Sequence, residues 1–176
     1  NSWAPERQGY YRIAGTGDEV EPMRHGDRYP LETSARGLAS YNKPAVALHA
    51  LRGIVGQDAF SSAFREYANR WAFKHPQPYD LFNTFNDVLK QDLDWFWTTM
   101  FFNTWTLDQA ISAVSSSSDG VVVTVQDLGY SPFPVLLRAT YADGSTTDNR
   151  ISVQEWLSDK RSATARFEPG DVVKIE

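Results

Sequence analysis

The hydrophobic pattern of this chain changes its period near Thr106, and this change limits the fold more than any other feature of the sequence. From about residue 35 to residue 102, apolar residues recur every three or four positions, as in amphipathic helices. After residue 107 they alternate with polar residues in short β-branched runs. The sequence therefore predicts an α+β fold with segregated elements: a helical domain over 1–106 and a β-sandwich domain over 107–176.

Apolar stripes with helical spacing follow one another in the first half. They are formed by Ala45, Leu48, Leu51 and Val55; by Phe60, Phe64, Tyr67, Ala68 and Trp71; by Leu81, Phe82, Phe85, Val88 and Leu89; and by Phe96, Trp97, Met100 and Phe101. Gly53 and Gly56 mark the first helix end, Asp58 is expected to cap the second helix, and Pro76 and Pro78 end it. Short links predict an antiparallel array of about four helices. Residues 1–33 show no period and are expected to be extended or irregular.

The second half has the marks of hairpin-linked strands. Strand-like runs occupy 107–114, 121–125, 133–141, 162–167 and 172–175. A serine-rich turn at 115–120, the hairpin signal Asp143-Gly144 and the pair Pro169-Gly170 separate them. About six such strands predict a small antiparallel β-sandwich.

Composition argues against several classes of partner. The net charge is −5, and lysine and arginine form no basic stripe, which is unfavourable for nucleic-acid binding. No apolar run approaches the roughly 20 residues that cross a bilayer, so no membrane partner is expected. Cysteine is absent, which excludes disulfides. The aromatic share of 14% is high, so aromatic rings are expected to dominate the core.

Tyr41 is the residue that points most directly to chemistry. It stands with Lys43 directly before a long apolar-periodic helix, in the run Ser40-Tyr41-Asn42-Lys43-Pro44-Ala45. A rigidly held phenol can present a neutral, pre-aimed O–H donor to an oxyanion. The alternative is an aromatic residue at a helix start that packs on the N-terminal segment. Lys43 is expected to lie on the opposite side and to pair with a carboxylate or cap carbonyls.

Taken in order, the runs at 40–48, 50–60, 64–67 and 92–96 resemble the aminopeptidase N-type (gluzincin) zinc metallopeptidases. The resemblance covers 38–102 most strongly and concerns the part of the catalytic domain that follows the metal-binding helices. It implies that Tyr41 opens a helix and donates a hydrogen bond to the tetrahedral intermediate of peptide hydrolysis. It also implies that a β-sandwich follows the catalytic domain. Pro44 stands where most relatives carry glycine, and proline is acceptable in a first helical turn.

The zinc ligands of that family have no counterpart in this sequence. The family uses HExxH and a glutamate on the next helix, whereas this chain has no HExxH and only His25, His49 and His75, no two of which share a helical turn. The chain is therefore interpreted as an inactive fragment of a zinc-dependent aminopeptidase. No zinc is expected in the fragment. The resemblance implies that the full-length protein, here called the parent, binds zinc and a peptide substrate, and that its remaining N-terminal part is the fragment's partner.

Two other functions stay open. The parent can be a non-catalytic scaffold or adaptor of the same fold, which an intact or broken HExxH would decide. Alternatively, the β-rich half can be a peptide- or carbohydrate-binding module, if Tyr130, Phe133 and Trp156 form an exposed aromatic platform.

Other candidate residues carry weaker signals. His49 lies about two turns beyond Tyr41 on a shared side and can face the same cleft, and His25 can lie near substrate. Glu66, Asp87 and Asp94 are possible paired carboxylates of a glycosidase, but no spacing brings two of them to one pocket.

Overall fold

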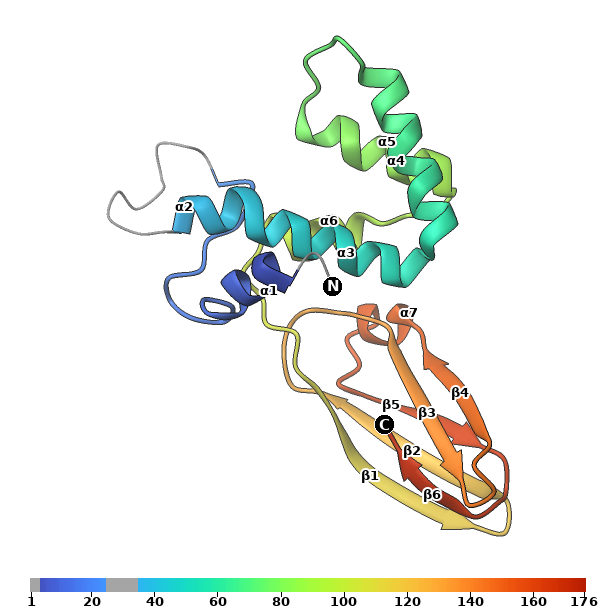
Figure 1. Cartoon of the computed structure of the whole chain (residues 1–176). Coiled ribbons are helices and arrows are strands. Elements are labelled where there is room, and N and C mark those ends of the chain that lie inside the picture. Colours follow the sequence, from blue (N-terminus) through green and yellow to red (C-terminus); the bar gives the residue numbers. More distant parts are fainter. Residues whose placement is uncertain (1–3, 25–34) are drawn as a thin grey trace. The chain divides into compact units, whose positions relative to one another are not determined.

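The structure is a computed structural model that describes residues 4–24 and 35–176 (Figure 1). The chain divides into two compact units, Asn1–Trp105 and Thr106–Glu176. The first unit contains helices and the second contains two small antiparallel sheets and a short helix. The predicted α+β fold with segregated helices and strands is confirmed.

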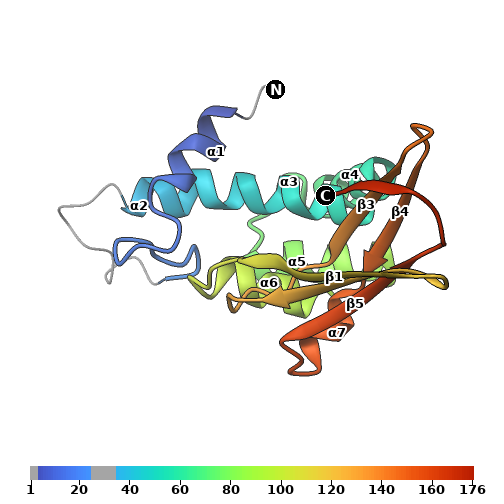
Figure 2. The ribbon, with the colours of Figure 1, turned by 90° about the horizontal axis from the view of Figure 1, so that it is seen from below.

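The helical unit is built around one long rod and a helical hairpin. Its elements are α1 (Ala4–Tyr11), α2 (Ala35–Gly37), the π-helical turn η2 (Leu38–Asn42), α3 (Lys43–Val55), α4 (Gln57–Trp71), α5 (Pro78–Leu89) and α6 (Asp94–Phe101). The residues at both junctions of η2 have helical dihedral angles, so residues 35–55 form one continuous rod (Figure 2). Gly56, at φ 93°, ends α3, and α4 packs against α5.

The apolar stripes predicted from the sequence face one another in this unit. The rings of Phe82 and Trp97 stack with centroids 4.6 Å apart, and Phe85 meets Trp97 edge-on at 5.8 Å. Phe85 and Phe96 are fully buried, as is Leu51 of α3. Burial of rings of this size is a large part of what stabilises a core.

Two predictions about this unit are wrong. Residues 1–33 were expected to be irregular, yet Ala4–Tyr11 form helix α1. This helix has no apolar stripe to reveal it, and Pro5 occupies its first turn, where the missing N–H costs nothing. Asp58 does not cap α4. The helix begins at Gln57 with Gly56 as its N-cap, so Asp58 lies inside its first turn.

Helix α5 has a complete capping box at its start. The Gln77 N–H donates to the Asp80 carboxylate at 2.7 Å, and Pro78 follows the cap. We expect Asp80→Ala to lower the free energy of unfolding by about 1 kcal/mol, because one backbone donor loses its partner. Urea unfolding would measure this. Asp18→Ala, which changes an exposed residue outside any helix, should leave stability nearly unchanged, and an equal loss in both variants would contradict the role of the cap.

The second unit is a β-sandwich, as predicted. Its elements are β1 (Gln109–Ser117), β2 (Gly120–Asp127), β3 (Val135–Tyr141), β4 (Thr146–Ile151), α7 (Val153–Leu157), β5 (Ser162–Phe167) and β6 (Val172–Ile175). The strands form two antiparallel sheets in the orders β1-β2-β5 and β4-β3-β6. Alternate residues of β2, β3 and β5 point into one shared core, which contains Val121, Val123, Val125, Leu137, Ala139, Ala163, Ala165 and Phe167.

Helix α7 was not predicted. Its N-cap is Ser152, whose hydroxyl accepts a hydrogen bond from the Gln154 N–H, and Trp156 enters the sandwich core. The signal was present as Ser152 followed three residues later by Glu155, the pattern of a capping box. A helix of this length is stabilised by the burial of its tryptophan more than by its own hydrogen bonds.

Asp127, at the end of β2, makes the stability of the sandwich depend on pH. Its carboxyl group is buried, accepts a hydrogen bond from Arg161 at 2.9 Å and has one oxygen without a partner among the described residues. Burial raises the pKa of Asp127, and the Arg161 charge only partly offsets this. The folded state therefore holds this proton more tightly than the unfolded chain does.

We expect the Asp127 contribution to stability to be largest below the ordinary aspartate pKa of about 3.9 and to fall as pH rises through the raised value. The measurement is urea unfolding at several pH values, followed by NMR signals of residues 106–176. The free energy of unfolding of the wild-type chain, minus that of Asp127→Asn, should decline with rising pH over this window. If this difference in free energy stays constant or grows with pH, burial does not disfavour the charged form of the Asp127 carboxyl group.

Candidate functional site

Tyr41 lies on the π-helical turn of the rod, and its side chain is 76% exposed. The Lys43 N–H donates to the Leu38 carbonyl, which is the bond that defines the wider turn. Tyr41 was expected to open a helix, and this is wrong in detail because the rod already begins at Ala35. Single π turns inside α-helices are uncommon and are often found at functional sites.

Pro44 explains why the π turn lies here. In a regular α-helix, Pro44 would have no N–H for the Ser40 carbonyl, and its ring would collide with that carbonyl. In the π turn immediately before Pro44, the preceding donor, the Lys43 N–H, bonds to the Leu38 carbonyl. Pro44 lies in the first turn of α3, as expected, and η2 continues directly into that turn. Pro44 therefore shapes the backbone that carries Tyr41.

A buried ion pair lies under the turn. Lys43 Nζ is 2.7 Å from Glu19 Oε1 and 2.7 Å from the Asn103 carbonyl oxygen, and the two charged side chains are 3% and 1% exposed. Tyr10 Oη donates to Glu19 Oε1 at 3.0 Å, and the Gly15 N–H donates to Glu19 Oε2 at 2.8 Å. The prediction that Lys43 pairs with a carboxylate or caps a carbonyl is confirmed, because it does both.

This network fixes the backbone that carries Tyr41. Burial, together with the nearby Glu19 carboxylate, raises the pKa of Tyr10, so its hydroxyl stays protonated and keeps donating to Glu19. Lys43 is buried while Tyr41 is exposed, so the two side chains leave the rod on opposite sides. The result is an exposed phenol on a backbone that is anchored from beneath.

A cavity of about 290 Å³ lies between α3 and α4, beyond Tyr41 along the rod. We call it the α3–α4 cavity, and its lining residues are Ala45, Leu48, His49, Arg52, Phe60 and Phe64. Tyr41, Ala45 and His49 follow at intervals of four residues, so Tyr41 lies about one turn before the cavity on the same face. His49 lines this cavity. Arg52 was not singled out from the sequence, although its spacing of three from His49 continues the face.

The other candidate carboxylates have structural roles. Arg70 bridges Glu66 at 2.7 Å and Asp87 at 2.6 Å on the surface of the α4–α5 hairpin. Asp94 accepts a hydrogen bond from the Asn86 side chain at 2.9 Å. Glu66 and Asp87 therefore share Arg70 as their counter-charge and Asp94 is held by Asn86, so none of the three forms an acid–base pair.

The histidines do not assemble a metal site in the described part of the chain. His75 is exposed in the link between α4 and α5, and His25 lies outside the described residues. Within 4–24 and 35–176, no three His, Cys, Asp or Glu side chains come together in a way that could hold a metal ion. The described residues therefore offer no zinc centre of the kind that the sequence resemblance implies for the whole protein. No helix in these ranges is long and apolar enough to cross a membrane.

The aromatic platform considered for the β-sandwich does not exist. Tyr130 is 72% exposed and its ring lies beneath the Arg161 guanidinium, but Phe133 and Trp156 are buried. Trp156 belongs to the sandwich core. A lone exposed ring is ordinary for a protein surface, so the structure gives no support to a carbohydrate- or peptide-binding β module.

Comparison with known proteins places the fold. No family model and no curated protein matches this sequence. Among solved structures, the chain is similar to the crystal structure of Legionella pneumophila aminopeptidase A in complex with aspartic acid, with a TM-score of 0.57. The fold resembles that of a segment of an aminopeptidase. The match covers 86% of this chain but only 17% of the Legionella chain, at 13% sequence identity, so the likeness concerns the fold alone.

Proposed function

We propose that this chain is part of a zinc-dependent aminopeptidase and that Tyr41 stabilises the oxyanion formed during peptide hydrolysis. The observation that carries the proposal is the exposed Tyr41 on a π turn that the buried Lys43–Glu19 pair anchors. The order of the sequence runs and the fold shared with a segment of an aminopeptidase support it.

A phenol O–H is well suited to the oxyanion stabilisation proposed for Tyr41. When a peptide bond is attacked, negative charge develops on the carbonyl oxygen, and a neutral O–H held in place beforehand stabilises that charge without reorganising. Tyrosine has few rotatable bonds, and its side chain meets solvent here instead of being packed into the core. The hydroxyl is therefore available to a substrate that approaches the rod from the Tyr41 side.

In this proposal, residues 1–106 are the helical C-terminal part of the catalytic domain and residues 107–176 are the β-sandwich domain that follows it. The remaining N-terminal part of the polypeptide would hold the zinc ion, which supplies Lewis-acid chemistry when bound. It would also recognise the free amino terminus of the peptide. The chain by itself is expected neither to bind zinc stoichiometrically nor to hydrolyse aminoacyl substrates.

The experiment that tests the proposal is hydrolysis of aminoacyl amides by the full-length parent and by its Tyr41→Phe variant. Turnover by the parent that depends on Tyr41 supports the aminopeptidase assignment. A folded parent that hydrolyses no aminoacyl substrate would overturn it and favour the scaffold alternative.

A further inference from the structure

We propose that the α3–α4 cavity binds a carboxylate of the peptide substrate, with Arg52 as the counter-charge and Phe60 and Phe64 as an apolar wall. The inference rests on the proposed function, because the peptide is the ligand that it places near Tyr41. It goes further by naming the group that is recognised and the residues that recognise it.

The cavity is lined by basic side chains and by no acidic one. Arg52 and His49 are its only titratable lining residues, and the other lining side chains are apolar. Within the described residues, no aspartate or glutamate pairs with the Arg52 guanidinium. The guanidinium offers a planar fork of donors that matches a carboxylate in two parallel hydrogen bonds. A partly buried cation beside apolar walls is best complemented by an anion.

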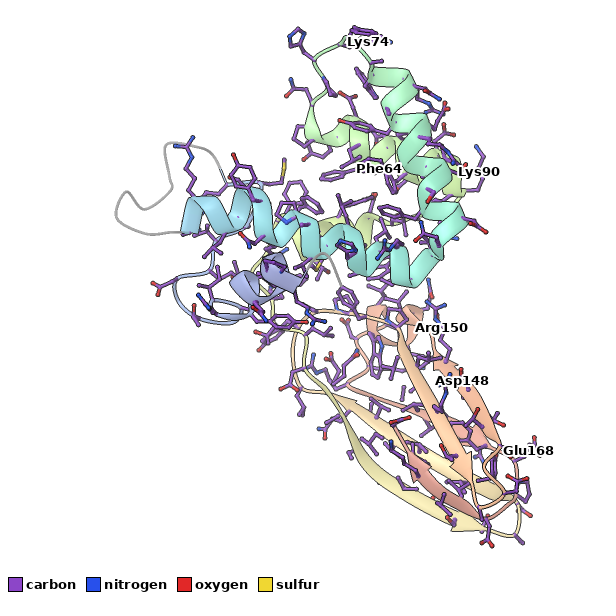
Figure 3. All side chains as sticks on the ribbon, in the orientation of Figure 1. Phe64, Lys74, Lys90, Asp148, Arg150 and Glu168 are labelled. Carbon is purple, nitrogen blue, oxygen red and sulfur yellow. The ribbon has the colours of Figure 1, made fainter. Side chains whose placement is uncertain are left out.

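The walls of the cavity suit the carbon part of such a ligand. The rings of Phe60 and Phe64 stack with centroids 5.9 Å apart, and Phe64 is 43% exposed although it lines the cavity. Figure 3 labels Phe64, which leaves α4 on the side of α3 and α5. The volume of about 290 Å³ is at the lower limit for ligand pockets, which suits one amino-acid residue with its carboxylate.

The distance from Tyr41 sets which carboxylate can reach Arg52. Between residues 41 and 52 the helical rise amounts to about 16 Å. An extended peptide advances roughly 3.3–3.6 Å per residue, so the carboxylate lies about five residues from the bond held near Tyr41. It can be the C-terminal carboxylate of a short peptide or an acidic side chain of a longer one.

The first test measures binding to this chain directly, by NMR titration with three hexapeptides of otherwise equal sequence. One has a free C-terminal acid, one a C-terminal amide, and one is an amide with aspartate at the fifth position. We expect at least one carboxylate-bearing peptide to bind about 10-fold more tightly than the plain amide, because a charge-assisted hydrogen bond is gained. The peptide that binds more tightly than the plain amide shows whether the site takes a C-terminal carboxylate or an acidic side chain.

Matched variants make this test specific. Arg52→Gln should abolish the preference, whereas Arg36→Gln, which changes an exposed arginine of α2, should keep it. Urea unfolding checks that Arg52→Gln leaves the fold intact. Equal affinity of the wild-type chain for all three peptides would overturn the proposal, and so would a preference that survives Arg52→Gln.

The second test uses turnover by the full-length parent. Arg52→Gln should raise KM for the preferred peptide about 10-fold and leave kcat unchanged, with no effect on the amide peptide. Tyr41→Phe, by contrast, should lower kcat for every peptide. A parent without peptidase activity would defeat the proposed function while the binding preference of this chain stays measurable. A Tyr41-dependent enzyme indifferent to Arg52 would defeat the carboxylate site alone.

Discussion

Tyr41→Phe is expected to lower kcat for peptide hydrolysis by the full-length parent by about 10²–10³-fold. Loss of one oxyanion donor typically removes about 2.7–4 kcal/mol of transition-state stabilisation. KM should change little, because the hydrogen bond strengthens only as charge develops on the carbonyl oxygen. The free energy of unfolding should also stay close to that of the wild type, because the side chain is 76% exposed.

The measurement is steady-state kinetics on aminoacyl amides, with Tyr130→Phe as the matched control. Tyr130 has a similar exposure of 72%, and phenylalanine keeps the ring beneath Arg161. The control should therefore retain full turnover. Unchanged turnover in Tyr41→Phe would remove Tyr41 from the mechanism, and an equal loss in both variants would point to a general effect of removing a hydroxyl.

Lys43→Met is expected to lower the free energy of unfolding by about 3–5 kcal/mol, the cost of leaving a buried charge without its partner. Glu19 is 1% exposed at its side chain and accepts hydrogen bonds from Lys43, Tyr10 and the Gly15 N–H. After the substitution, its negative charge would remain in a place that water does not reach. Urea unfolding of the chain measures the loss.

Lys90→Met is the matched control for this prediction. Lys90 pairs with Asp87 at 2.9 Å but is 81% exposed, and Figure 3 shows it on the outside of the α4–α5 hairpin. Exposed ion pairs contribute about 0–1 kcal/mol to the free energy of unfolding, so Lys90→Met should lose little stability. The double variant Glu19→Gln/Lys43→Met should recover part of the stability, because no buried charge remains. Equal losses for Lys43→Met and Lys90→Met would mean that the buried pair has no special role.

The buried pair also connects stability to the proposed chemistry. Lys43 joins Glu19 to the Asn103 carbonyl oxygen, at two residues from Tyr41 on the opposite side of the rod. Loss of these contacts would free the π turn that holds the phenol. In the parent, Lys43→Met should therefore reduce turnover even where the chain remains folded, since oxyanion donors act by being positioned in advance.

Much of the fold could be predicted from local patterns. The stripes of α3 to α6, the end of α3 at Gly56 and the extents of β5 and β6 all follow from hydrophobic period and turn chemistry, which are properties of neighbouring residues. Helices α1 and α7 were missed, because neither has a long apolar stripe. The capping residues around α7 were the only local signal available for it.

For the candidate site too, some features could be predicted from the sequence and others could not. The sequence by itself determined that Tyr41 and Lys43 stand beside a long helix and that Pro44 cannot donate a hydrogen bond there. Only the tertiary structure decided that Pro44 lies inside the rod, that Lys43 meets Glu19 and Asn103, and that Arg52 enters a cavity with Phe64. The reason is physical: period, caps and turns depend on adjacent residues, whereas a buried ion pair or a cavity depends on which distant segments share a space without water.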